Sequence, residues 1–172
     1  PGIALTDHGA MFGIKEFFDY VNKKNGPLLR ERKDLKKQIK ALEEQEERSA
    51  EDEAKLSELR EQLQAAEAKP LFKPILGCEV YCARRSRFKK DANVPNPYRP
   101  NQSVDNSGWH LVLLAKDLTG YKNLIKMVSR SWIDGYYYRP RIDKELLEAH
   151  HEGIIASSAC LGGEIPQHIM YG

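Results

Sequence analysis

Short apolar runs alternate with longer amphipathic segments along most of the chain. The runs predict strands, and they occupy residues 2–7, 74–82, 109–115 and 153–158. Apolar residues at helical spacing predict helices over residues 11–24, 119–133, 143–151 and 163–170. Asn25-Gly26 is expected to end the first helix. Strands separated by helices are typical of an α/β protein whose sheet is mostly parallel or closed into a barrel.

Residues 28–69 interrupt this alternation, because they contain no Gly, Pro or aromatic residue. Their apolar positions form two stripes at helical spacing: Leu28, Leu35, Ile39 and Leu42, then Leu56, Leu59, Leu63 and Ala66. Ser49 lies between the stripes and precedes three acidic residues within the next four positions, which is typical of a helix N-cap. We therefore predict two antiparallel helices packed as a coiled-coil hairpin, inserted into a domain that spans residues 1–172. The gap between the stripes disfavours one continuous helix.

The same segment is highly charged, with 10 basic and 12 acidic residues. Surface loops tolerate insertions well, so one interpretation of this hairpin is a solvated spacer. The other interpretation is a docking arm for a partner protein.

Composition restricts the class of protein further. With 172 residues and 41% hydrophobic residues, the chain is long enough to bury a core. Its formal net charge of +2 does not by itself predict binding to nucleic acid or to a membrane, and no apolar run approaches the ~20 residues of a membrane span. Three Cys argue against a disulfide framework and favour a reducing, cytoplasmic setting. The chain begins in a strand-like run and ends in a helix-like one, so we expect it to be part of a longer protein.

Side chains able to bind metal ions occur in or next to the predicted strands. They are Asp7, His8, Glu79, His110 and Cys160. Gly9 permits a sharp turn directly after the first two of these residues. Because neighbouring strands meet at one rim of a sheet, this pattern predicts a metal site there.

Each of these residues also has an ordinary structural interpretation. Asp7 fits a helix N-cap, Glu79 fits the solvent face of a strand, and His110 fits a hydrogen-bonded core histidine. Cys160 fits a nucleophile as well as a soft metal ligand, but no short pattern supplies the base that a nucleophile needs. Cys78 alternates with Glu79 and is predicted to lie in the core.

Basic residues form two further candidate sites, both for phosphate or DNA. Arg84 and Arg85 begin a loop over residues 84–108, which is rich in Pro, Asn and Ser and is expected to be mobile. Arg139 and Arg141 flank Pro140, so a fixed turn aims a guanidinium at a phosphate or at Asp143. The alternative for the loop is a solvated charged surface.

Six ordered segments resemble the PHP (polymerase and histidinol phosphatase) domain found in the alpha subunits of bacterial DNA polymerase III. They are ALTDHG (4–9), KPILGCEVY (73–81), HLVLLAK (110–116), GYKNL (120–124), YRPRID (138–143) and SACLGGEIP (158–166). The resemblance implies a distorted seven-stranded (β/α) barrel, of which this chain forms part. It also implies up to three divalent metal ions (zinc, manganese, iron or magnesium) held by nine ligands. Five ligand positions match this chain: Asp7, His8, Glu79, His110 and Cys160. The family's His-x-His and Asp-x-His pairs are expected before Pro1 and after Gly172.

The resemblance also implies a place in DNA replication. In that family the domain lies at the N-terminus of a polymerase, so the implied partners are DNA, a proofreading exonuclease subunit and the sliding clamp, without a membrane. The polymerase site itself is implied to lie in later domains. Three roles remain open for the PHP domain: a metal-dependent 3′-5′ exonuclease, a non-catalytic metal-stabilised scaffold for a replication partner, or a phosphatase of the histidinol-phosphate type.

Overall fold

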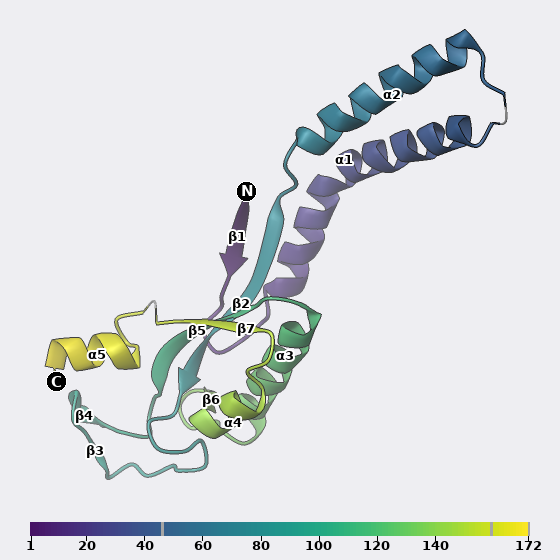
Figure 1. Cartoon of the computed structure of the whole chain (residues 1–172). Helices are drawn as coiled ribbons and strands as arrows, with labels where there is room; N and C mark the ends of the chain where they lie inside the picture. Colours follow the sequence, from purple (N-terminus) through teal and green to yellow (C-terminus); the bar gives the residue numbers. More distant parts are fainter. Residues whose placement is uncertain (46, 159, 172) are drawn as a thin grey trace. The chain divides into compact units, whose positions relative to one another are not determined.

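The computed structural model describes residues 1–45, 47–158 and 160–171 (Figure 1). Three residues therefore lie outside the described ranges: Glu46 in the predicted hairpin, Ala159 in the predicted turn before Cys160, and Gly172. The chain divides into two compact units. One comprises residues 1–2 and 16–73, and the other comprises residues 3–15 and 74–172.

The larger unit is built around a sheet with the strand order β1-β2-β5-β7. The bounds of these strands are Gly2–Leu5, Lys73–Cys82, Trp109–Ala115 and Ile154–Ser157. A short strand β6 (Arg141–Ile142) pairs with β2 in parallel, but β2–β5 and β5–β7 are both antiparallel. The expectation of a mostly parallel sheet is therefore wrong for these two pairs.

The segment between β2 and β5 explains the first antiparallel pair. A parallel neighbour needs a crossover connection, usually a helix, whereas this segment forms its own antiparallel pair. That pair consists of β3 (Pro95–Asn96) and β4 (Arg99–Ser103). Residues 84–108 were expected to be an irregular mobile loop, and this expectation is wrong for the part that pairs as strands.

Helix α3 (Leu118–Ile133) supplies the apolar face that covers the sheet. Asp117 caps its N-terminus by accepting a hydrogen bond from the Gly120 N–H. Gly120 lies so close to Gly153 that an added Cβ would be 1.8 Å from the Gly153 carbonyl oxygen. The fully buried core residues come from both layers and include Cys78, Leu113, Leu124, Met127 and Ile142.

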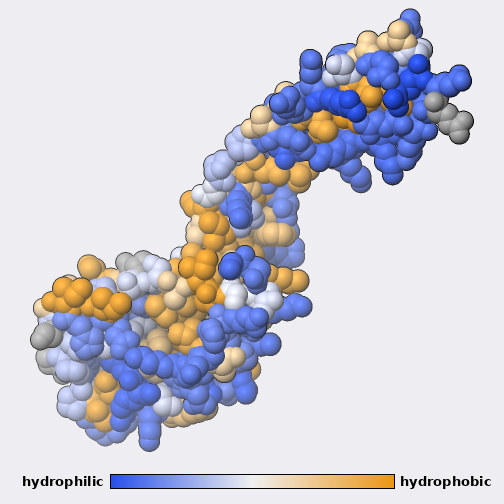
Figure 2. Space-filling model, in the orientation of Figure 1, coloured by the Kyte–Doolittle hydropathy of each residue, from blue (hydrophilic) through white to orange (hydrophobic). Residues whose placement is uncertain are grey.

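Two shorter helices complete the larger unit. Helix α4 (Lys144–Ala149) is capped by Asp143, whose carboxylate accepts from the Leu146 N–H. Helix α5 (Glu164–Tyr171) follows β7 and leaves Ile165 and Ile169 exposed, and Figure 2 shows hydrophobic residues gathered over it. Both helices lie where the apolar spacing predicted them, within one or two residues at each end.

The smaller unit contains most of helix α1 (Ile14–Glu43) and helix α2 (Ala50–Ala68). The predicted end of the first helix at Asn25-Gly26 is wrong, because α1 continues through Pro27. The Asn25 side chain, which at a helix end bonds the local backbone, is instead paired with the backbone of Phe72 at 2.8 and 3.1 Å. A proline inside a helix costs about 3 kcal/mol, so packing elsewhere in this unit offsets a substantial penalty.

That packing joins the two helices through the predicted stripes. Leu35, Ile39, Leu56, Leu59 and Ala66 are all buried in one apolar cluster. Ser49 caps α2 as predicted, and Asp52 completes a reciprocal capping box. The Arg32 guanidinium donates to carbonyls at the end of α2, among them Ala66 at 2.9 Å. The outer surface of this hairpin is largely hydrophilic in Figure 2. Coiled-coil geometry and the insertion of the hairpin, residues 28–69, within one domain remain predictions. No helix in the described ranges has the length and apolar character needed to cross a membrane.

Candidate metal centre

Three side chains from three separate parts of the larger unit converge on one point. They are His8 after β1, Glu79 on β2 and His110 on β5, and each offers a ligand atom within 4.8 Å of the others. His8 Nε2 lies 3.3 Å from Glu79 Oε2, and His110 Nδ1 lies 2.8 Å from Glu79 Oε1. The carboxylate of Glu79 therefore bridges the two imidazoles.

The backbone after β1 holds His8 beside Glu79. Residues 8 and 79 form an isolated parallel bridge. In it the Glu79 N–H donates to the backbone carbonyl of Asp7, and the Gly9 N–H donates to the backbone carbonyl of Glu79. Gly9 has φ 64°, and an added Cβ would come within 2.7 Å of Pro140. Glycine is thus required at this position by both conformation and space. The sequence predicts this turn from the conformational freedom of glycine.

His110 reaches the cluster from the beginning of β5 rather than from its end. In the antiparallel register His110 is opposite Tyr81, two residues beyond Glu79. The two rings make an edge contact with centroids 5.0 Å apart, so Tyr81 forms one wall of the site. The pleat of β2 places Tyr81 on the same face as Glu79. The spacing of two residues between them is the sequence signal that could have identified Tyr81.

Cys160 adjoins the cluster from the segment after β7. Its Sγ lies 3.2 Å from His110 Nδ1, and the Gly162 N–H is 3.4 Å from the same sulfur. The side chain is half-buried. Cys160 therefore contacts the ring of His110, although it is not among the three residues whose ligand atoms all lie within 4.8 Å of one another.

Asp7 points away from the other four candidates. Its carboxylate accepts a hydrogen bond from the Gly13 N–H at 3.0 Å, one residue before α1. Side chains alternate along an extended backbone, so Asp7 and His8 point in opposite directions before Gly9 turns the chain. This contact corresponds to the N-terminal capping interpretation of Asp7.

The donor set fits a divalent transition metal. Two nitrogen or oxygen ligands about 2.0 Å from a tetrahedral ion lie ~3.3 Å apart. His8 Nε2 and Glu79 Oε2 have this separation, at 3.3 Å, whereas His110 Nδ1 and Glu79 Oε1, at 2.8 Å, are at hydrogen-bond distance. Imidazole, carboxylate and thiolate together suit zinc, iron or manganese better than magnesium. The other two cysteines are core residues, as predicted for Cys78, and burial raises the thiol pKa of Cys78 to about 12 and of Cys82 to about 11.

The four candidate phosphate-contacting arginines lie in different environments. Arg139 is exposed near the Tyr81 ring, with Cζ 5.8 Å from the ring centroid. Arg84 lies over Trp109 at 4.1 Å. Arg85 instead forms a bidentate ion pair with Asp105. Arg141 is fully buried and donates only to backbone carbonyls among the described residues.

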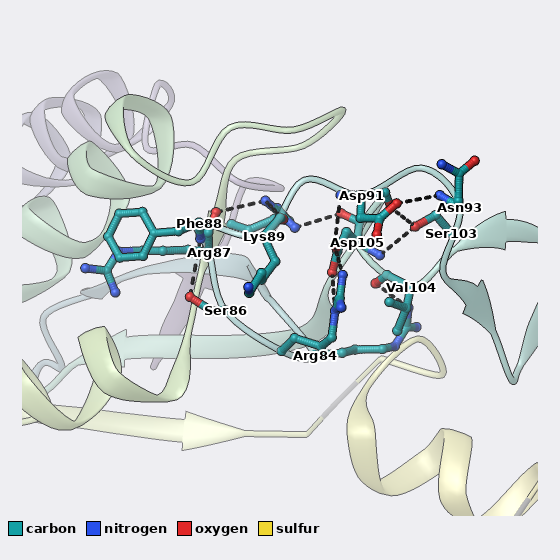
Figure 3. A network of polar contacts seen from close by, with 12 residues as sticks. Arg84, Ser86, Arg87, Phe88, Lys89, Asp91, Asn93, Ser103, Val104 and Asp105 are labelled. Atoms are coloured by element: carbon teal, nitrogen blue, oxygen red, sulfur yellow. Dashed lines mark hydrogen bonds and ion pairs between the residues drawn. The ribbon is translucent and has the colours of Figure 1, made fainter.

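In the basic segment 84–91, Arg87 is buried, whereas Arg85, Lys89 and Lys90 are exposed. Asp105 accepts from Arg85 and from the Asp91 N–H, and Ser103 donates to Asp91 (Figure 3). Arg87, not Arg141, pairs with Asp143, at 2.7 Å. The interpretation of this loop as a solvated charged surface is wrong for Arg87, which is buried, whereas Arg85 is exposed although it pairs with Asp105.

One supporting residue gave no sequence signal. The Trp132 indole on α3 donates to the Gly9 carbonyl at 2.8 Å, and so fixes the turn that carries His8. An aromatic residue near a helix end is ordinarily a packing residue. The sequence does not indicate which acceptor its indole N–H will bond.

Comparison with known proteins identifies relatives along the whole chain. A family model described as the PHP domain matches residues 1–172. Curated relatives include the DNA polymerase III alpha subunits of Thermus aquaticus (40% identical over 170 residues, 99% of this chain) and Deinococcus radiodurans (45% over 172 residues, the entire chain). That of Borreliella burgdorferi is 47% identical over 99 residues, 58% of this chain. The chain spans 10%, 9% and 8% of the length of these three relatives.

Proposed function

The chain belongs to the PHP domain family, and from this premise we propose that it is the metal-holding part of a phosphoesterase site in a bacterial DNA polymerase III alpha subunit. The observation that carries the proposal is the convergence of His8, Glu79 and His110, with Cys160 beside them. In this proposal the sheet is part of a distorted seven-stranded barrel, and the longer protein carries out DNA-directed DNA synthesis elsewhere.

His8, Glu79, His110 and Cys160 would hold a divalent ion, with Asp7 as a further ligand once its carboxylate releases Gly13. Such an ion supplies Lewis-acid chemistry, which activates water and polarises a phosphoryl oxygen. The protein's own contribution is the arrangement of these ligands. The Glu79 side chain is 13% exposed and that of His110 is 22% exposed, whereas that of His8 is 61% exposed. A substrate therefore approaches from the His8 side.

Arg139 is placed to attract that substrate. It is exposed, it lies near the Tyr81 ring, and Tyr81 in turn contacts His110. A guanidinium binds phosphate oxygens in a bidentate manner. We propose that the reaction is 3′-5′ excision of nucleotides from a DNA end, which is proofreading within the polymerase chain.

The test is an excision assay on the polymerase that contains this chain. His8→Ala and Cys160→Ala are expected to abolish 3′-5′ excision while polymerisation continues, because they remove ligands without touching the polymerase site. His151→Ala is the matched control, since it removes an exposed histidine that bonds only Glu148 among the described residues. Excision that continues unchanged in both ligand variants would refute a catalytic role.

A second candidate is a docking function for the hairpin. Residues 28–69 have their own apolar cluster and a reciprocal cap, and they present a hydrophilic surface. We propose a protein partner of the replication machinery, such as a proofreading subunit or the sliding clamp. Replacing residues 28–69 with a short Gly-Ser linker should then reduce capture of that partner without loss of bound metal. Unchanged capture would leave the hairpin as a spacer.

A further inference from the structure

A small polar recess lies beside His110 and is not used in the proposed metal centre. Its polar lining includes Arg84, Arg99, Gln102 and Gln167, with His110 forming another wall. We call these four residues and the space between them the arginine recess. Its volume is about 10 Å³, which is room for one water-sized group. The recess can therefore receive a single oxygen atom of a larger ligand.

Arg84 is held rigidly but has unused hydrogen-bond donors. Its guanidinium lies 4.1 Å from the centroid of Trp109, the residue immediately before His110. A guanidinium carries five N–H donors. Among the described residues, one nitrogen reaches the Val104 carbonyl at 3.5 Å, while the buried Nε has no partner.

Arg99 adds a second positive charge to the same recess. Burial, and then the nearby charge of Arg99, lower the pKa of the Arg84 guanidinium. No carboxylate in the described ranges forms an ion pair with either arginine, in contrast to Arg85 and Arg87, which bind Asp105 and Asp143. Arg84 is half-buried and Arg99 is exposed. Two cations that line one recess without an acid are stabilised by a bound anion.

The recess and the candidate metal centre both adjoin the imidazole ring of His110. His110 Nδ1 faces Glu79 and Cys160. Gly162, which lines the recess, lies against the Cγ–Cδ2 side, where an added Cβ would be 3.0 Å from Cδ2. An anion in the recess is therefore adjacent to a phosphate at the centre and distinct from it.

We propose that the arginine recess binds a non-reacting phosphate of a nucleic-acid strand, next to the phosphoester held at the metal centre. The inference rests on the proposed function, since it assigns the substrate class of that same site. A small phosphomonoester has one phosphate, which the centre would use. A strand offers a second one, and its anionic oxygen fits between Arg84 and Arg99. The neutral donors are the Gln102 amide and the second N–H of the Gln167 amide, whose nitrogen also donates to the Leu161 carbonyl.

The test measures binding of a fluorescein-labelled, six-nucleotide single-stranded DNA to the full chain by fluorescence polarisation. Arg99→Gln is expected to weaken binding about tenfold, the effect of one charge-assisted hydrogen bond. Arg84→Lys, which keeps the charge but loses the fork, should weaken binding as well. Lys90→Gln is the matched control, because it removes an equal charge from an exposed position of the same segment; it should change binding less than twofold. Equal losses in Arg99→Gln and Lys90→Gln would overturn the proposal, because they would indicate a diffuse charge effect.

Repeating the titration in EDTA separates this inference from the proposed function. The Arg99→Gln effect should persist without metal, because the recess needs none. If the effect persists but no metal binds to the chain, the recess stands and the phosphoesterase proposal fails. If metal binds but Arg99→Gln matches the wild type, the recess proposal fails alone. Inorganic phosphate that competes as well as the oligonucleotide would overturn the assignment to a strand.

Discussion

Arg141 offers the clearest quantitative prediction, because its whole guanidinium is buried among backbone carbonyls. Its nitrogens donate to Gly135 at 3.0 Å, Asp105 at 2.7 Å, Arg87 at 2.9 Å and Lys89 at 3.0 Å. One side chain thus connects β6 to two stretches of the 84–108 segment. The substitution Arg141→Met keeps most of the volume and removes all of these donors.

The expected loss of stability is about 3–5 kcal/mol. Hydrogen bonds to a charged group are each worth about 1.5–3 kcal/mol, but their sum overstates the effect. Methionine avoids the cost of burying a charge, and water can reach some of the freed carbonyls. A buried acceptor left without a partner costs about 1–3 kcal/mol, so the net loss over the carbonyls that Arg141 serves is a large part of the 5–15 kcal/mol that stabilises a domain.

Urea unfolding combined with hydrogen exchange measures this loss. Exchange should accelerate first at Val104 and Ala83, whose N–H groups bond Val94 and Ile142 in the affected region. Arg139→Met is the control, because the Arg139 side chain is exposed and, among the described residues, makes only a long contact with the Tyr81 ring. A change below 1 kcal/mol in Arg141→Met, or an equal change in the control, would refute the reasoning.

Three further predictions follow from burial and capping. Iodoacetamide at pH 8 should modify Cys160 first. It should modify Cys78 and Cys82 only after unfolding, because burial raises the pKa of both thiols. Mass spectrometry that detects modification of all three cysteines at the same time would contradict this. Burial alone would raise the pKa of the Asp143 carboxyl, but hydrogen bonds from two N–H groups and from a guanidinium lower it overall. Its contribution to stability is therefore complete above about pH 4 and is lost as the pH falls through the lower, folded pKa, so Asp143→Asn should flatten the acid side of a pH–stability curve measured with urea. Ser49→Ala should destabilise the hairpin by about 1 kcal/mol in thermal unfolding, and an unchanged midpoint would show that the cap is redundant.

Local physics made much of the fold predictable. The apolar runs located β2, β5 and β7 because alternation and strand length are local properties. The two leucine stripes and Ser49 likewise identified the paired helices α1 and α2. The direction of strand pairing was not predictable, since it depends on how residues 84–108 return to the sheet, and that segment has no strong periodicity.

The sequence identified the residues of the candidate site, but it did not predict the orientation of every side chain. The ligand atoms of His8, Glu79 and His110 lie within 4.8 Å of one another, and Cys160 contacts His110; metal binding by these residues stays a prediction. Asp7 instead accepts a hydrogen bond from the Gly13 N–H at the start of α1.

The arginines show the same limit of sequence reasoning. Arg139 and Arg141 look equivalent on either side of Pro140, yet one is exposed and the other is fully buried. Their difference arises from the short parallel pairing of β6 with β2, which no local pattern encodes.

The central claim is that His8, Glu79, His110 and Cys160 hold a metal ion, and elemental analysis tests it most directly. The full chain is incubated with zinc or manganese, desalted, and compared with a folded His8→Ala/His110→Ala double variant. A His150→Ala/His151→Ala variant controls for the loss of two histidines outside the site. We expect about one equivalent of metal in the wild type and in the control, and none in the His8→Ala/His110→Ala variant. An unloaded wild type, or equal metal in both double variants, would contradict it.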